Sequence, residues 1–300
     1  MTDCPSDDIH RKIAEHPCYS KEAQHKFGRI HLPVAPKCNI QCRYCDRKFD
    51  CVNESRPGVT STLLTPEEAL KRTEEVIARH PYITVVGIAG PGDPLANDET
   101  IETFRLIRNR FPEMTLCVST NGLMLSDRFD DLKSVGIDTL TVTMNAFDPA
   151  VQEQIVDHVV YRGKHLRGRD AAAFLIEKQL EGIKKAVDAG MVVKINTVLI
   201  PGVNDKHIPA LAEKLNKMGV FIMNIMSLIP QAGFAGTVPA SEEEKQALRE
   251  QCAVFVKQMK HCRQCRSDAY GLIGNDLSQM SCKRRNDVRN TSGVISPKDL

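Results

Sequence analysis

Strand-like and helix-like segments alternate along most of this chain, and this alternation restricts the possible folds more than any other feature. After an opening strand expected at 30–34, further β-rich runs follow at 84–89, 115–119, 139–144, 192–199 and 221–228. Helical patterns are expected near 98–111, 127–135, 171–189 and 208–218. Repeated β-α units imply a parallel sheet, so about six of them predict an α/β fold with a partial (β/α)6 TIM-like barrel.

A capping pattern marks the start of the first helix of this repeat. Thr65 is a suitable N-cap, Pro66 suits the first helical position, and Glu68 completes a capping box. Small or apolar residues that include Ala69 and Val76 give the helix a buried stripe. A further helical pattern covers 242–259.

The repeat divides the chain into three expected regions. Residues 1–29 form a polar N-terminal extension, residues 30–260 form the barrel, and residues 261–300 form an irregular C-terminal segment with a polar tail. Reactive groups of parallel β/α folds gather beyond the carboxyl ends of the strands. Motifs that directly follow a strand are therefore the candidates for function.

Composition and charge exclude several classes of protein. The 300 residues carry a net charge of only +2, whereas a nucleic-acid-binding surface would show a marked basic excess. The sequence has no apolar run of membrane-spanning length and no signal-peptide pattern, so we expect a cytoplasmic protein. Thiols stay reduced there, and the eleven cysteines indicate metal ligands before disulfides.

Three closely spaced cysteines follow the first expected strand. Cys38, Cys42 and Cys45 lie in the stretch PKCNIQCRYC at 36–45. Soft sulfur ligands favour an iron–sulfur cluster or zinc. A structural zinc site closes its shell with a fourth ligand, whereas three thiolates on a [4Fe–4S] cluster leave one iron open for a substrate. The alternatives are a zinc knuckle and a chance cysteine cluster.

The spacing of this triplet, with Tyr44 before its last cysteine, resembles that of the radical S-adenosylmethionine (SAM) superfamily. The resemblance implies a [4Fe–4S] cluster whose open iron binds the amino and carboxylate groups of SAM. Reduction of that cluster cleaves SAM to methionine and a 5′-deoxyadenosyl radical. It also implies a barrel of the radical SAM type.

Polar or glycine-rich turns after the later strands are candidates for the SAM pocket. The resemblance implies that the turn with Gly90, Gly92 and Asp93 binds the amino group of SAM, although such a turn is by itself often only a loop. Small polar residues at the strand ends suit the ribose and carboxylate, or else cap the following helices. The expected cofactor-binding residues are Tyr44, Gly90, Gly92, Asp93, Asn121, Thr143, Asn145, Asn196 and Ile200.

Further motifs at both ends of the chain narrow the resemblance to one family. Together with the triplet they closely resemble NifB, the family of nitrogenase cofactor maturases, over roughly residues 10 to 280. The stretches are HPCYS at 16–20, RIH at 29–31, DCVNESRPG at 50–58 and HCRQCRSDAYGL at 261–272. Many members carry a further C-terminal domain for cofactor carriage, and we expect a short form without it.

The family resemblance implies a specific reaction. Two further [4Fe–4S] clusters are fused around a SAM-derived carbide, with an extra sulfur, into the 8Fe–9S–carbide precursor of the nitrogenase cofactor. The implied partners are an iron–sulfur cluster donor, a cofactor scaffold or carrier protein, and an electron donor such as a ferredoxin. Three [4Fe–4S] clusters and SAM are the expected cofactors.

The remaining cysteines and one histidine supply candidate ligands for the two accessory clusters. We expect Cys18, His31 and Cys51 to hold one, and Cys262 with Cys265 to anchor the other. A C-x2-C pair is also a common zinc half-site, and a strand histidine is more often a core residue.

Other residues of these stretches have less certain roles. Glu54 and Arg56 are either an ordinary salt bridge or groups that orient SAM and move protons. Cys117 is expected first to be a packing residue, with a role near the clusters as the alternative, and Cys252 to be a packing residue. Cys4 and Cys282 receive no role.

Two other functions remain possible from the sequence. A radical SAM cyclase of molybdopterin synthesis also carries a second cluster near its C-terminus, but it needs a purine nucleotide site that we do not find here. A non-enzymatic iron–sulfur scaffold or electron carrier would use the same cysteines without SAM. Formation of 5′-deoxyadenosine separates the enzymes from the carrier.

Overall fold

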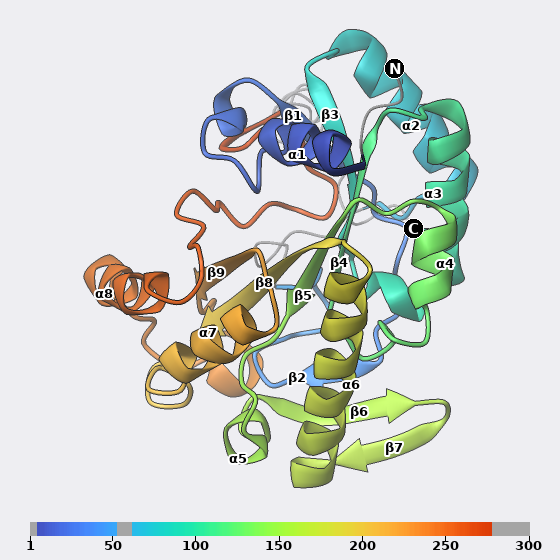
Figure 1. The fold of residues 1–300 in the computed structure, drawn as a ribbon. Coiled ribbons are helices and arrows are strands. Elements are labelled where there is room, and N and C mark those ends of the chain that lie inside the picture. The colour runs from blue at the N-terminus through green and yellow to red at the C-terminus, as the bar shows by residue number, and fades with distance from the viewer. Residues whose placement is uncertain (1–4, 53–61, 278–300) are drawn as a thin grey trace, which may run out of the picture.

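Six parallel strands form the body of a curled, open sheet in the computed structural model, which describes residues 5–52 and 62–277. The full sheet has the order β11-β10-β1-β3-β4-β5-β8-β9, with β10 and β11 antiparallel at one edge (Figure 1). The strands are β1 (Gly28–His31), β3 (Ile83–Ile88), β4 (Thr115–Thr120), β5 (Thr139–Thr143), β8 (Val192–Leu199), β9 (Ile222–Ser227), β10 (Tyr270–Leu272) and β11 (Asn275–Asp276). The predicted partial (β/α)6 barrel is confirmed.

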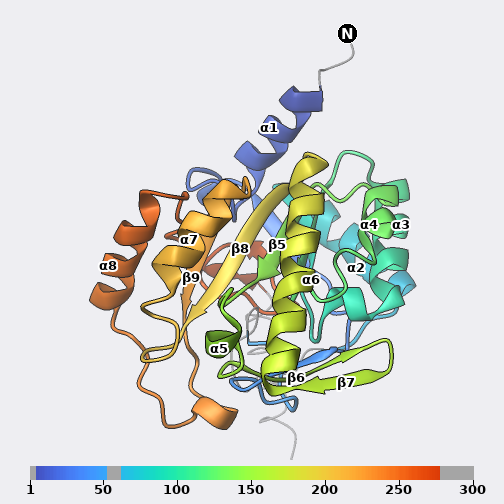
Figure 2. The ribbon, with the colours of Figure 1, turned by 60° about the horizontal axis from the view of Figure 1, so that its bottom comes forward.

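Helices cover the outer face of this sheet (Figures 1 and 2). Apolar side chains of strands and helices meet there in the main core, which includes Ile30, Phe104, Leu140 and Leu211. The covering helices are α2 (Pro66–Arg79), α3 (Asp98–Arg110), α4 (Phe129–Ser134), α6 (Gly168–Asp188), α7 (Ile208–Lys217) and α8 (Glu242–Ala253). Helices α1 (Pro5–Glu15) and α5 (Pro149–Gln152) lie outside the repeat, and short 3-10 turns occur at Ala23–His25, Pro94–Ala96 and Ala232–Phe234.

Several predicted boundaries agree with the structure, and two do not. Thr65 and Glu68 form the predicted capping box at the start of α2. Strand β1 ends at His31 and not at residue 34, because Pro33 lacks the amide hydrogen needed to continue the ladder. Helix α8 ends at Ala253, since the residues after it pair with β9: Met259 N donates to Met223 O at 2.8 Å.

A second, three-stranded antiparallel sheet escaped sequence analysis. It consists of β2 (Ile40–Cys42), β6 (Val156–Tyr161) and β7 (Lys164–Arg167). Strand β2 is too short to show a period, yet it lies inside the cysteine triplet and pairs with β6 through Gln41 and His158. Figure 2 shows the β6–β7 hairpin at the opposite end of the barrel from α1. This small sheet fixes the backbone at Cys42.

The C-terminal segment joins the two edges of the open parallel sheet. Lys257 and Met259 hydrogen-bond to Met223 of β9, and Tyr270 in β10 pairs with Ile30 of β1. The chain between them therefore crosses the open side of the barrel. Within the described residues, no helix combines the length and apolar character needed to cross a membrane.

Candidate cluster and cofactor site

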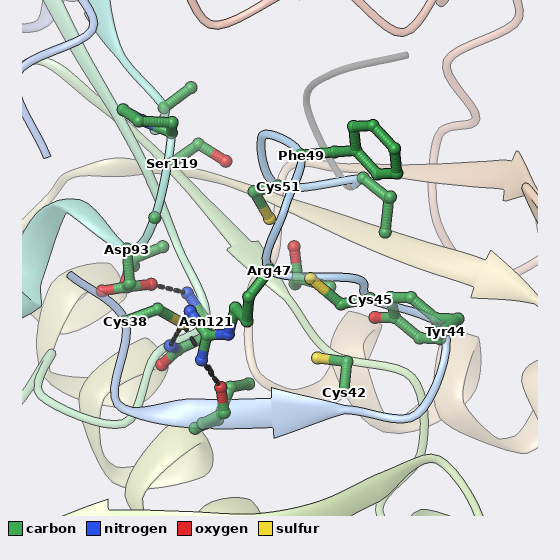
Figure 3. A pocket seen from close by; sticks show the side chains of 17 residues that line it. Cys38, Cys42, Tyr44, Cys45, Arg47, Phe49, Cys51, Asp93, Ser119 and Asn121 are labelled. Carbon is green, nitrogen blue, oxygen red and sulfur yellow. Dashed lines mark hydrogen bonds between the residues drawn. The ribbon is translucent and has the colours of Figure 1, made fainter. Parts of the chain in front are cut away.

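The cysteine triplet borders a cavity at the carboxyl end of the parallel strands. Cys38, Cys42 and Cys45 line about 540 Å³ of space that is partly open to solvent. Figure 3 shows their side chains around a common centre, with Cys51 approaching from another part of the loop. We call this space the triplet cavity.

The surroundings of these three cysteines favour binding of a metal cluster over a state with free thiolates. Burial raises the pKa of Cys38, Cys42 and Cys45, because a buried thiolate without a cation is unfavourable. Bound iron would supply the positive charge and deprotonate them. No three His, Cys, Asp or Glu side chains in the described part of the chain surround a point as one ion requires. Each thiolate ligand of a cubane binds a different iron from outside the cube, so the wider spacing of these sulfurs still fits a cluster.

Arg47 is a cavity residue that sequence analysis did not single out. Its guanidinium donates hydrogen bonds to the carbonyl of Ile40 and, at 3.1 Å, to Gln41 Oε1. Figure 3 shows it reaching in among the cysteines. The position places a cation beside the thiols and beside any anionic cluster that they hold.

The glycine-rich turn after β3 packs directly against the chain that leads to the triplet. Gly92 N donates to Ala35 O at 2.6 Å, and Asp93 N donates to Lys37 O at 2.8 Å. A Cβ on Gly92 would lie 2.3 Å from Lys37 O. Glycine is therefore needed here for close backbone approach, which sets the position of the turn relative to the cysteines.

Asp93 supports this turn through buried hydrogen bonds. Its carboxylate accepts from Asn121 N at 2.6 Å, Thr120 Oγ1 at 3.0 Å and Leu95 N at 3.0 Å. Burial raises the pKa of Asp93 to about 6, against the lowering effect of these donors. The carboxylate thus joins the end of β4 to the turn. Asn121 in addition donates to Asn39 Oδ1 at 2.7 Å, within the triplet loop.

The other predicted SAM-binding residues fall into different surroundings. Tyr44, Thr143 and Asn121 line the triplet cavity together with Gly92 and Asp93. Gly90 lies in the same turn, where its carbonyl accepts from Ala35 N at 3.2 Å. Three residues are placed elsewhere: Asn145 is buried behind Tyr44, Ile200 is in an apolar cluster, and Asn196 is in a second cavity.

Asn145 holds Tyr44 in place. Its Nδ2 donates to Tyr44 Oη at 2.9 Å, and its Oδ1 accepts from Val198 N at 2.8 Å. Both partners are buried, so the amide satisfies two groups that water does not reach. This geometry makes Asn145 a positioning residue behind the wall of the cavity.

A second cavity lies deeper in the barrel, against the inner face of the strands. It encloses about 620 Å³, partly open to solvent, and we call it the inner cavity. Its walls include several possible metal ligands: His16, Cys18, His31, Cys117, Cys262 and Cys265. Ala89 and Ser119 line both cavities, which are therefore adjacent.

The structure groups the accessory ligands differently from our prediction. Cys51 lines the triplet cavity, where its amide donates to Pro91 O at 2.8 Å, and is separated from Cys18 and His31. Cys262 and Cys265 instead share the inner cavity with Cys18 and His31. The reason is the course of the C-terminal segment, which crosses the open side of the barrel beside β1.

Cys117 was expected to be a packing residue, and the structure corrects this expectation. In β4 its neighbours Leu116 and Val118 point into the core, so alternation turns Cys117 and Ser119 toward the barrel interior. Alternation was the signal that could have found it. Cys252 is buried in the main core, as predicted. Residues Glu54, Arg56, Cys4 and Cys282 lie outside the described residues.

The electrostatics of the inner cavity favour a neutral imidazole at His31. Its Nδ1 lies 3.0 Å from Arg266 O and must donate, which leaves Nε2 with its lone pair. Burial, and next the charge of Arg29, lower the pKa of His31 to about 4. Burial also raises the pKa of Cys18 to about 12. Thiols and a neutral imidazole are suitable donors for iron.

Arg29 connects this cavity to the C-terminal strands. Its guanidinium is buried, forms an ion pair with Asp276, and approaches Cys265 Sγ at 3.0 Å. It also donates to Gly271 O at 2.8 Å. A buried charge is tolerated when it is paired and hydrogen-bonded in this way.

The chain is similar to several known proteins. Residues 32–215 match the Radical SAM superfamily. The sequence is 49% identical over 275 residues to the FeMo cofactor biosynthesis protein NifB of Klebsiella pneumoniae, covering 89% of this chain and 59% of that protein. The sequence is 46% identical over 277 residues to the NifB protein of Azotobacter vinelandii, covering 90% of this chain and 55% of that protein. The chain thus spans little more than half the length of these curated relatives.

A solved structure supports the fold. Streptococcus suis SuiB bound to S-adenosylmethionine superimposes with a TM-score of 0.58 at 12% sequence identity. The match covers 80% of this chain and 52% of SuiB. At that identity the likeness concerns the fold alone.

Substitution of Gly92 tests the close approach of the turn to the triplet loop. Gly92→Ala places a methyl group against backbone atoms, so we expect a loss of about 1–3 kcal/mol in the free energy of unfolding. Chemical denaturation measures it. Gly236→Ala is the matched control, because a Cβ there meets no neighbouring atom within 4 Å. Equal stability of the two variants would contradict the proposed constraint.

Substitution of Asn145 tests its positioning role. Asn145→Ala leaves Tyr44 Oη and Val198 N without this partner, and we expect a loss of about 1–3 kcal/mol in the free energy of unfolding. Tyr44→Phe removes only one of the two bonds and should cost less. The double variant should cost less than the sum of the single ones, because both remove the same bond. Additive losses would show that the two side chains act independently.

Proposed function

This chain belongs to the radical SAM superfamily and resembles NifB proteins over about 90% of its length, and on that basis we propose that it is a cofactor maturase of the NifB type. Its reaction would fuse two [4Fe–4S] clusters, with insertion of a SAM-derived carbide and an extra sulfur, into the 8Fe–9S–carbide precursor of the nitrogenase cofactor. The superfamily implies one [4Fe–4S] cluster and SAM as resident cofactors.

The observation that carries the proposal is the adjacency of two cavities with different ligand sets. The triplet cavity has the superfamily cysteines, whereas the inner cavity has further thiols and an imidazole, and both include Ala89 and Ser119 in their walls. A radical formed in one space would then lie next to a group held in the other. Holding reactants at close range in this way lowers the entropic part of the barrier.

The residues of the triplet cavity would position the resident cofactors. Cys38, Cys42 and Cys45 would hold the cluster, and the turn with Gly92 and Asp93 would bring backbone polar groups to SAM. When bound, the cluster and SAM supply a 5′-deoxyadenosyl radical. Tyr44, fixed by Asn145, closes the wall beside the triplet and helps to exclude water.

The inner cavity would hold iron–sulfur substrate. His31 offers an imidazole lone pair, and Cys18 and Cys117 line the same cavity. Cys262 and Cys265 enter from the C-terminal segment. Cys51, which lines the triplet cavity, would contact a cluster near the boundary between the cavities. We assign substrate binding to these residues as one set, in place of the two separate sets expected from sequence.

We propose that the three regions of the chain contribute different parts of the site. Residues 1–29 would supply ligands from the N-terminal extension, residues 30–260 the radical SAM barrel, and residues 261–300 the C-terminal ligand segment. An iron–sulfur cluster donor, an electron donor such as a ferredoxin, and a scaffold or carrier for the product would be the partners. Glu54 and Arg56 are proposed to orient SAM or move protons.

Removal of the triplet tests the enzymatic part of the proposal. The variant Cys38→Ala/Cys42→Ala/Cys45→Ala should form no detectable 5′-deoxyadenosine after anaerobic reconstitution and dithionite reduction. It should also lose about four irons per chain, the content of one cubane. Cys252→Ala, which removes a thiol from the main core, is the control and should retain both properties. Undiminished 5′-deoxyadenosine from the triple variant would refute the assignment.

Removal of the C-terminal pair tests substrate binding separately. Cys262→Ala/Cys265→Ala protein should still cleave SAM reductively, since its triplet is intact, but should yield no carbide-containing product. Chromatography of 5′-deoxyadenosine and spectroscopy of the extracted cluster measure the two outcomes. Zinc bound by this pair in the unmodified protein, or full product formation without the pair, would exclude the proposed role.

A further inference from the structure

Two histidines line the inner cavity, and only His31 has been given a role above. We propose that His16 donates a hydrogen bond from Nε2 to a sulfide of the anionic cluster bound there, without being an iron ligand. This inference rests on the proposed function, because it requires a cluster in the inner cavity. It adds a residue that sets the electronic properties of that cluster.

The backbone of residue 18 determines where the proton of His16 lies. Cys18 N donates a hydrogen bond to His16 Nδ1 at 3.1 Å. An amide nitrogen can only donate, so Nδ1 must present its lone pair. The ring hydrogen of a neutral His16 is consequently on Nε2. The tautomer follows from this bond.

The second ring nitrogen has no protein partner. His16 is only 1% exposed, and its Nε2 is buried without a hydrogen-bond acceptor among the described residues. An unsatisfied buried donor costs about 1–3 kcal/mol. His16 lines the inner cavity, so a bound ligand with an acceptor atom would satisfy this donor.

The surrounding turn holds the ring in one orientation. Tyr19 N donates to His16 O at 3.0 Å, and Ser20 N donates to the same carbonyl at 3.1 Å. The Tyr19 ring packs edge-on against the imidazole with centroids 4.6 Å apart. Tyr19 Oη is itself anchored to Leu140 O at 3.1 Å. His16 is therefore rigid, as a directional hydrogen-bond donor needs to be.

His31 has the opposite arrangement of its ring nitrogens. Its Nδ1 donates to Arg266 O, which leaves the Nε2 lone pair for a metal. In His16, Nδ1 accepts a hydrogen bond instead, which leaves the ring hydrogen on Nε2. For His16 to bind iron through Nε2, the proton would have to move to Nδ1 and face the amide hydrogen of Cys18. The two imidazoles are thus prepared for different roles toward the same ligand.

The charges around the cavity define the chemical class of that ligand. Lys194 and Arg29 both line the inner cavity, and both side chains are buried. Arg29 is ion-paired with Asp276, so Lys194 adds a positive charge beyond that pair; with an N–H donor and several thiols, these groups suit a sulfide-rich anionic cluster. Hydrogen bonds to cluster sulfurs are among the factors that set the reduction potential. A donor to sulfide stabilises the more negative, reduced form and raises that potential.

Two substitutions separate the two ring nitrogens of His16. The amide of His16→Asn lies near the position of Nδ1, so its oxygen retains the bond from Cys18 N, while the donor toward the cavity is lost. The amide of His16→Gln reaches the position of Nε2 and restores a donor there. Both are made in the triplet variant Cys38→Ala/Cys42→Ala/Cys45→Ala, so that the triplet cluster is absent and the signals come from the iron–sulfur substrate.

The measurement is an anaerobic redox titration of these proteins, followed by electron paramagnetic resonance. We expect an unchanged iron content in all of them, a more negative midpoint potential for His16→Asn, and a potential close to that of the parent for His16→Gln. A merely structural role would shift both variants or neither. Equal potentials for the parent and His16→Asn would overturn the proposal.

Nitrogen couplings in pulsed electron paramagnetic resonance provide a second, independent outcome. The strong coupling of a directly bound imidazole should persist in His16→Asn and disappear in His31→Ala. The reverse pattern would make His16 the ligand and overturn the inference while leaving a cluster in the cavity. A triplet variant that binds no cluster at all would instead contradict the proposed function, and the role of His16 with it.

Discussion

A half-barrel of six parallel strands has two open edges and an interior that its own helices do not cover. Helices α2, α3, α4, α6, α7 and α8 pack on the outer face, as parallel sheets require, but they leave the inner face to be closed by other parts of the chain. The N-terminal turn around Tyr19 and the segment between β9 and β10 provide that closure. These two segments carry Cys18, Cys262 and Cys265, so the contacts that close the barrel also form the walls of the inner cavity.

The buried charges of the interior depend on this closure. Arg29 of β1 is compensated by Asp276 and by carbonyls of the C-terminal strands, none of which belongs to the β-α repeat. Without them a guanidinium would be buried without a partner, which is strongly unfavourable. The same contacts bring Arg29 within reach of Cys265. The C-terminal segment is thus held to the barrel by an interaction that also positions a candidate ligand.

The β-α repeat and the cysteine triplet could be predicted from the sequence, because both depend on local patterns. Alternating periods identified the six parallel strands, and capping residues located the start of α2 within one residue. The grouping of ligands was not accessible in this way, because it depends on where the C-terminal segment crosses the barrel. Proximity in sequence linked Cys51 to Cys18 and His31, whereas the fold turns Cys51 toward the triplet. In the sequence His16 was only one residue of a motif. The hydrogen-bond partners of its ring nitrogens depend on the fold and could not be predicted.

The two residues that line both cavities, Ala89 and Ser119, have small side chains. Closed β/α barrels fill their interiors with bulky branched residues, but here the lining of the inner cavity includes Gly87 of β3, Ala89 directly after it, and Cys117 and Ser119 of β4. At Gly87 even a Cβ would lie 3.0 Å from the ring of His31. Larger residues would displace this imidazole or separate the two spaces. The proposed reaction needs a radical source and its target on either side of a thin boundary, so these small residues are as much a part of the site as the thiols that face it.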